Sequence, residues 1–105
     1  MRDSQALSSL LARQQSAGKR YAAICAAPAV VLAAQDLLPQ EGGSTCYPAP
    51  AFREQLTTPS EDAVVVQGMV TTSKGPGTAL DFALSLGEQL FGKDVRDKIQ
   101  KEMLL

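Results

Sequence analysis

One thiol stands at a point of the sequence where a cysteine can become reactive. The stretch Tyr21–Pro28 reads YAAICAAP, so a short apolar run ends at Cys25 and a proline-led run of small residues follows at once. This pattern predicts a strand, a sharp turn and a helix, with Cys25 at the turn. The first amides of a helix lack intrahelical partners and carry partial positive charge, which stabilises a thiolate. Cys25 is therefore a candidate nucleophile, and a buried structural cysteine is the competing interpretation.

The other side chains exclude several familiar chemistries. The sequence contains no histidine, which excludes Ser-His-Asp and Cys-His arrangements within this chain and most catalytic metal sites. The Gly75–Thr78 turn lacks the spacing and the lysine position of a Walker loop, although its amides are a candidate anion-accepting edge. We predict that the second thiol, Cys46, is a small core residue rather than a redox partner of Cys25. We expect no metal and no cofactor.

Three stretches resemble, in the same order, motifs of the ThiJ/PfpI superfamily, in the branch of the parkinsonism-associated deglycase and its bacterial relatives. They are 23–28 (AICAAP), 44–48 (STCYP) and 72–83 (TSKGPGTALDFA). The first is similar to the nucleophile elbow of that family, and the third is the most specific of the three. The resemblance implies an α/β fold, the C-terminal half of a flavodoxin-like three-layer sandwich with a cysteine nucleophile elbow.

The resemblance also implies roles for individual residues. Cys25 would be the catalytic nucleophile, and the backbone amide of Ala26 would stabilise the oxyanion. Tyr47 occupies a position where several members carry a histidine and others an aromatic residue. Tyrosine titrates near ~10, so Tyr47 is a weaker acid–base group near neutral pH than histidine. Tyr47, Gly75 and Pro76 are expected to line the pocket, and both a catalytic and a packing role for Tyr47 stay open.

Three functions compete on this basis. The first is attack of Cys25 on methylglyoxal or its early glycation adducts, as in a cofactor-free, glutathione-independent glyoxalase or deglycase. The second is an oxidative-stress sensor or chaperone in which Cys25 is oxidised to a sulfinate. The third is an inactive fragment. Members of the family are single domains of roughly twice this length, so residues 1–105 are expected to be the C-terminal portion of one domain.

The absent N-terminal half would supply the first strands of the sheet, a glutamate that hydrogen-bonds the cysteine, and glycine amides that face it. The apolar helices predicted at 29–38 and 76–91 need a larger covering sheet than the strands of this chain provide. We therefore expect that the chain alone is inactive, and that it associates with itself or with an N-terminal half. The resemblance further implies a homodimer.

Composition and charge agree with a cytoplasmic protein. Of the 105 residues 45% are apolar and 20% are charged, which is typical of a soluble globular domain. No apolar run approaches the ~18 residues that span a bilayer, and the N-terminus has no signal-peptide pattern. Two cysteines without a disulfide framework suit a reducing compartment. The basic residues of positions 1–20 lack aromatic neighbours and a basic stripe, so neither nucleic acid nor a membrane is an expected partner.

The elements that must position Cys25 follow from caps, periodicity and turn residues. Asp3 or Ser4 is the predicted cap of a helix that Gly18 ends, and Gln67-Gly68 is the predicted hairpin turn. Strands are predicted at 20–24, 44–47, 63–66 and 69–73. Further helices are predicted at 29–38, 52–56, 76–91 and 93–105, the last with Val95, Ile99 and Met103 on its inner face.

Overall fold

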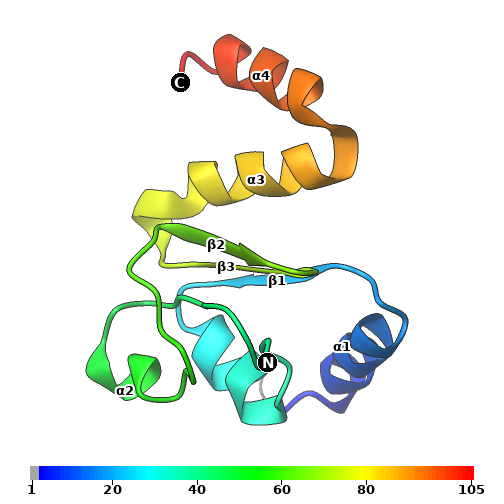
Figure 1. Ribbon diagram of the computed structural model, residues 1–105, viewed down its shortest axis with the longest axis vertical. Helices are drawn as coiled ribbons and strands as arrows, with labels where there is room; N and C mark the ends of the chain where they lie inside the picture. The colour runs from blue at the N-terminus through cyan, green and yellow to red at the C-terminus, as the bar shows by residue number, and fades with distance from the viewer. Residues whose placement is uncertain (1–2) are drawn as a thin grey trace.

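The computed structural model describes residues 3–105. A small sheet lies between two layers of helices (Figure 1), with α3 on one face and α4 beyond it, and α1, η1, η2 and α2 on the other face. The sheet consists of β1 (Tyr21–Ile24), β2 (Val64–Gln67) and β3 (Val70–Ser73). The helices are α1 (Gln5–Ser16), η1 (Pro28–Leu32), η2 (Ala33–Gln35), α2 (Pro50–Arg53), η3 (Pro76–Thr78), α3 (Ala79–Phe91) and α4 (Lys93–Glu102).

The strand order is β1-β3-β2. β1 runs parallel to β3 with Ile24 opposite Ser73, and β2 runs antiparallel to β3 with Gln67 opposite Val70. The two-residue connection between β2 and β3 contains Gly68 at φ 62°, a conformation that glycine adopts without steric cost. The predicted hairpin is confirmed. Within residues 3–105, β1 pairs only with β3, so β1 is an edge strand.

The element that precedes β1 begins and ends where the sequence predicts. The hydroxyl oxygen of Ser4 accepts a hydrogen bond from the N–H of Leu7 at 3.2 Å, which satisfies one of the free amides at the start of α1. Gly18 at φ 68° lets the chain leave the helix and turn towards β1. The predicted N-terminal cap and the glycine stop are both confirmed.

Three predicted elements differ from the structure. The helix predicted at 52–56 is α2 at Pro50–Arg53, and the other two differ more. Residues 44–47 form no strand, but an extended segment with a single β-bridge between Ser44 and Pro59. The Thr45 N–H is bonded to the side-chain oxygen of Thr72 at 2.9 Å rather than to a strand backbone, which explains the missing ladder. The helix predicted at 29–38 begins at Pro28 and ends earlier, because Asp36 turns the backbone into the left-handed region at φ 57°.

Two apolar clusters lie on the η1 side of the sheet, and the first packs η1 against the sheet while the second packs η1 against the segment around α2. One contains Val31, Leu32, Leu37 and Val70, and the other contains Ala29, Cys46 and Leu56. Cys46 is thus a core residue, as the sequence predicts. On the other face of the sheet, Val95, Ile99 and Met103 of the α4 segment are each 40–46% exposed. The predicted inner face of this helix is therefore not covered within residues 3–105.

Leu32 should be among the residues that stabilise the fold most, because it is 1% exposed and packs in the first cluster. We expect Leu32→Ala to lower the free energy of unfolding by about 2–5 kcal/mol, through lost burial and a residual cavity. Leu10→Ala is the matched control, since Leu10 is 53% exposed and should cost less than about 1 kcal/mol. Urea unfolding followed by circular dichroism measures both, and equal losses would contradict this assignment of the core.

Candidate functional site

Cys25 lies at a sharp turn directly after β1. Its N–H donates to the carbonyl oxygen of Ser73 at 3.1 Å, which continues the β1–β3 pairing by one residue. Its φ is 65°, in the left-handed region, where a residue with a side chain is destabilised by roughly 1–2 kcal/mol. Such conformations persist only where the surrounding structure holds them. The predicted order of strand, turn and helix around Cys25 is confirmed.

The turn leaves one backbone donor open beside the thiol. The carbonyl oxygen of Ala26 accepts the N–H groups of Ala29 and Val30 at 3.0 and 2.9 Å, so helical bonding begins at Ala26. The Ala26 N–H itself has no acceptor among residues 3–105. The Cys25 side chain is partly exposed, in contrast to that of Cys46, which is buried. A partly exposed cysteine is thus followed directly by a residue whose N–H is unpaired within residues 3–105.

Tyr47 lies beside Cys25. Its N–H donates to the carbonyl oxygen of Cys25 at 2.7 Å, so both main-chain polar groups of Cys25 are bonded. The Tyr47 ring is 46% exposed and meets Phe52 edge to face, with ring centroids 6.4 Å apart. A Cβ atom placed on Gly75 would lie 3.7 Å from Cδ2 of Tyr47. Tyr47 thus contacts both the Cys25 main chain and Gly75. That Tyr47 and Gly75 line a substrate pocket stays a prediction.

The Gly75–Thr78 turn does not offer the anion-accepting amide at Gly75 that its sequence suggests. The Gly75 N–H donates to Oγ1 of Thr78 at 3.1 Å and is therefore occupied. Pro76 is exposed at the start of η3, and its place in a substrate pocket stays a prediction. Sequence reasoning did not single out Thr78 or Ser73. The sequence signal for Thr78 is a threonine three residues after the turn glycine, because the side chains of such threonines bond to nearby backbone groups.

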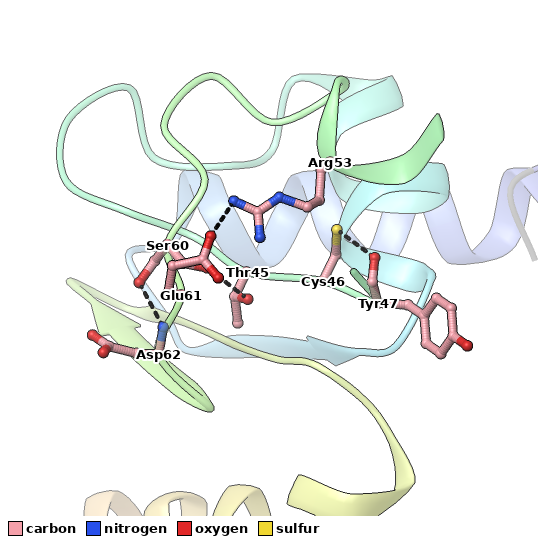
Figure 2. Close-up of polar contacts among 7 residues, drawn as sticks. All are labelled: Thr45, Cys46, Tyr47, Arg53, Ser60, Glu61 and Asp62. Atoms are coloured by element: carbon pink, nitrogen blue, oxygen red, sulfur yellow. Dashed lines mark hydrogen bonds and ion pairs between the residues drawn. The ribbon is translucent and has the colours of Figure 1, made fainter. Parts of the chain in front are cut away.

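The second thiol has the opposite environment. Cys46 is 2% exposed and its Sγ donates to the carbonyl oxygen of Tyr47 at 3.3 Å. Burial raises the pKa of the Cys46 thiol, an effect that nearby Arg53 opposes and Cys25 reinforces. Figure 2 shows Arg53 directed towards Glu61, with which it forms an ion pair at 2.6 Å. The same guanidinium lowers the pKa of the exposed Glu61 carboxyl.

Proton-transfer groups are scarce around Cys25. Within residues 3–105 the hydrogen bonds of Cys25 are both made by its main chain, to Ser73 and Tyr47, and no carboxylate is bonded to it. No cluster of three or more potential metal ligands occurs in the same range. Tyr47 meets Cys25 through its main-chain N–H. The chemistry visible here is that of a thiol with one free amide donor.

An apolar cavity lies along the open side of β1. It has a volume of about 350 Å³ and includes Leu7, Leu11, Ala23, Ile24, Val31 and Phe82 in its lining. The N–H groups of Tyr21 and Cys25 point towards β3, and successive residues of a strand alternate in direction. The polar backbone groups of Ala22 and Ile24 therefore point away from β3, towards this open side. None of the helices within residues 3–105 is both long and apolar enough to cross a membrane.

Comparison with known proteins identifies the family. The family model described as DJ-1/PfpI family matches residues 1–89. This chain belongs to the DJ-1/PfpI family. The match covers the Cys25 turn, the Tyr47 segment and the Gly75–Thr78 turn, which are the three stretches on which the sequence resemblance rests. The predicted family and the predicted α/β fold are confirmed.

Individual relatives agree with this assignment. The chain is 37% identical to Protein DJ-1 homolog A of Arabidopsis thaliana, over 100% of this chain and 27% of that protein. It is 35% identical to the glutathione-independent glyoxalase DJR-1.2 of Caenorhabditis elegans, over 91% of this chain and 51% of that protein. The solved structure of oxidized Toxoplasma gondii DJ-1 superposes with a TM-score of 0.89 at 41% identity, over 98% of this chain and 55% of that chain.

The chain thus spans about half, or less, of the length of the relatives that it matches. The matched region is the C-terminal part of those proteins. The described chain contains the strand, turn and helix around the cysteine, together with the two turns that lie against it.

Proposed function

We propose that Cys25 is the nucleophile of a glyoxalase-type or deglycase-type site that acts on methylglyoxal or its early glycation adducts. The observation that supports this most is the geometry of the Cys25 turn. The residue is held at φ 65°, its side chain is partly exposed, and the neighbouring Ala26 N–H lacks an acceptor within residues 3–105. The similarity to the glutathione-independent glyoxalase of Caenorhabditis elegans supports the substrate class.

The proposed reaction has three steps. The Cys25 thiolate attacks the aldehyde carbon, and the oxygen that gains the electron pair is stabilised by the Ala26 N–H before it is protonated to a hemithioacetal. A base then moves the proton from the former aldehyde carbon to the neighbouring carbon, which yields the lactate thioester. Water hydrolyses the thioester, releases lactate and restores the thiolate. Methylglyoxal and water together become lactate and a proton, so no external oxidant is needed.

The second step needs a base that the described residues do not place at Cys25. Tyr47 adjoins Cys25 through its main-chain N–H, which donates to the Cys25 carbonyl oxygen. We propose that Tyr47 orients the substrate oxygen through its hydroxyl. A carboxylate from protein outside this chain would then perform the proton transfer, as the family resemblance implies.

We further propose that this protein surface joins the chain at the open side of β1. Within residues 3–105 the outward backbone groups of Ala22 and Ile24 pair with no other strand, and the adjoining cavity of about 350 Å³ is apolar. The opposite edge, β2, is bordered by the charged residues Asp81, Glu88 and Arg96, and charges discourage strand addition. Because β1 leads directly into Cys25, a strand added to β1 would end close to the thiol. The partner would be an N-terminal half of the domain, in the same or a separate chain.

The nucleophile assignment is tested by substitution in a complete domain. A chimera that joins the N-terminal part of Toxoplasma gondii DJ-1 to this chain should form lactate from methylglyoxal without glutathione. Cys25→Ser should abolish lactate formation, whereas Cys46→Ser should retain it, since Cys46 is buried in the core. Loss of activity in both variants with normal folding, or in neither, would overturn the assignment.

A redox role is the second candidate, supported by the difference in exposure between the two thiols. One equivalent of peroxide converts the Cys25 thiolate to a sulfenate and water, and a second equivalent gives a sulfinate, whose charge the Ala26 N–H would stabilise. A cytoplasmic, reducing compartment suits either function, because Cys25 must rest as a thiol. A folded chimera that forms no lactate but accumulates a Cys25 sulfinate at low peroxide would favour the sensor.

A further inference from the structure

Ser73, the last residue of β3, is bonded to the main chain of Cys25. Its carbonyl oxygen accepts the Cys25 N–H at 3.1 Å, and its side chain is 0% exposed. Its Oγ donates to the carbonyl oxygen of Ala63 at 2.8 Å and lies 2.6 Å from Oγ1 of Thr78. A single serine at the end of β3 thus contacts the Cys25 turn, the start of β2 and the start of α3.

Thr78 links this serine to the Gly75 turn. Its Oγ1 accepts the Gly75 N–H at 3.1 Å and lies 3.0 Å from the Gly75 carbonyl oxygen, which also accepts the Thr78 N–H at 2.9 Å. A hydroxyl has one proton to donate. If Ser73 donates to Ala63, then Thr78 donates to Ser73, and both hydroxyls and both main-chain groups of Gly75 have partners. The two hydroxyls therefore depend on each other.

These hydrogen bonds connect the residues that contact Cys25 on its two sides. Gly75, which Thr78 holds, lies against the Tyr47 ring, and Tyr47 in turn donates its N–H to the Cys25 carbonyl oxygen at 2.7 Å. Ser73 holds the Cys25 N–H from the other side. The N–H of Cys25 is thus bonded to Ser73, and its carbonyl oxygen is bonded to Tyr47. The Ser73 and Thr78 hydroxyls link Ser73 to the Gly75 turn on which the Tyr47 ring packs. A non-glycine residue at φ 65° needs such support, because its own preference is for negative φ.

We propose that Ser73 and Thr78 are positioning residues that keep Cys25 in its left-handed conformation, in which the residue is partly exposed. Neither side chain touches substrate in this scheme, and each acts through the Gly75 turn and the β3 end. The proposal deepens the proposed function, since it concerns the same thiol. It requires only that Cys25 is reactive towards a small electrophile.

The test measures the rate at which iodoacetamide labels Cys25 in the 105-residue chain. We expect Thr78→Val to slow labelling by about threefold to tenfold, which is less than the ~10²-fold that a misplacement of about 1 Å can cost in catalysis. Thr78→Ser keeps the hydroxyl and should restore the rate. Ser73→Ala breaks the same hydroxyl bond from the other side and should also slow labelling.

Thr71→Val is the matched control. Thr71 is 1% exposed on the same strand, and its Oγ1 accepts a hydrogen bond from Gln89 at 2.9 Å, away from the Cys25 turn. It should lower thermal stability about as much as Thr78→Val, yet leave the Cys25 labelling rate unchanged. Equal slowing in Thr71→Val and Thr78→Val, an unchanged or faster rate in Thr78→Val, or failure of both hydroxyl variants to fold would assign the pair a purely structural role.

The labelling test separates this proposal from the proposed function. Slower labelling in Thr78→Val, rescued by Thr78→Ser, supports the positioning role even if a complete domain forms no lactate. Lactate formation by a complete domain whose Thr78→Val variant labels at the normal rate would support the function and overturn the positioning role.

Discussion

The chain alone should convert methylglyoxal to lactate hardly faster than a free thiol in solution does. It contains the thiol of Cys25 and the open N–H of Ala26, but within residues 3–105 no carboxylate is bonded to the site. General acid–base assistance contributes about 10²–10⁴-fold to such reactions. In the proposed site an N-terminal half would also help to position the substrate, and the loss of that positioning slows the reaction further.

The measurement is lactate formation without glutathione, by the 105-residue chain and by the chimera with the N-terminal part of Toxoplasma gondii DJ-1. The chimera should exceed the chain by at least about 10²-fold. The chain mixed with that N-terminal part as a separate polypeptide should give an intermediate rate that rises with concentration. Turnover by the chain alone at the rate of the chimera would contradict the view that its site is incomplete.

The local order of strand, turn and helix could be predicted from the sequence because each boundary carries its own residue signal. Ser4 caps α1 with its hydroxyl, Gly18 and Gly68 adopt positive φ, and Pro28 opens η1. These signals act over three or four residues, so neighbouring sequence determines them. The position of Cys25 at a turn follows from the same local pattern, although its φ of 65° could not be read from composition.

What the sequence did not predict depends on contacts between distant segments. The segment at 44–47 reads as a strand, but the Thr45 N–H is bonded to the Thr72 side chain, 27 residues away. The contact between the Ser73 and Thr78 hydroxyls could not be predicted either. A serine in a strand and a threonine in a turn do not usually bond to each other's side chains. Val95 and Ile99 on α4 are exposed because this face of the helix is not covered within residues 3–105. The periodicity of a helix shows which face is apolar, but not what packs against that face.

Cys25 should be alkylated and oxidised well before Cys46 in the folded chain. The Cys25 side chain is partly exposed, whereas Cys46 is 2% exposed among apolar residues. Burial raises the pKa of the Cys46 thiol, so less of it is thiolate at a given pH, and labelling also requires a local opening of the core. We expect Cys25 to react about 10²-fold faster at neutral pH.

Peptide mapping after limiting iodoacetamide or peroxide measures this ratio. In urea, where both thiols are exposed, the two rates should become similar, and this control removes any intrinsic difference between the two peptides. The ratio should also fall as the pH rises, because Cys46 gains thiolate only above the pH at which an exposed cysteine ionises. Equal labelling in the folded chain, or faster labelling of Cys46, would remove the basis for assigning the nucleophile to Cys25.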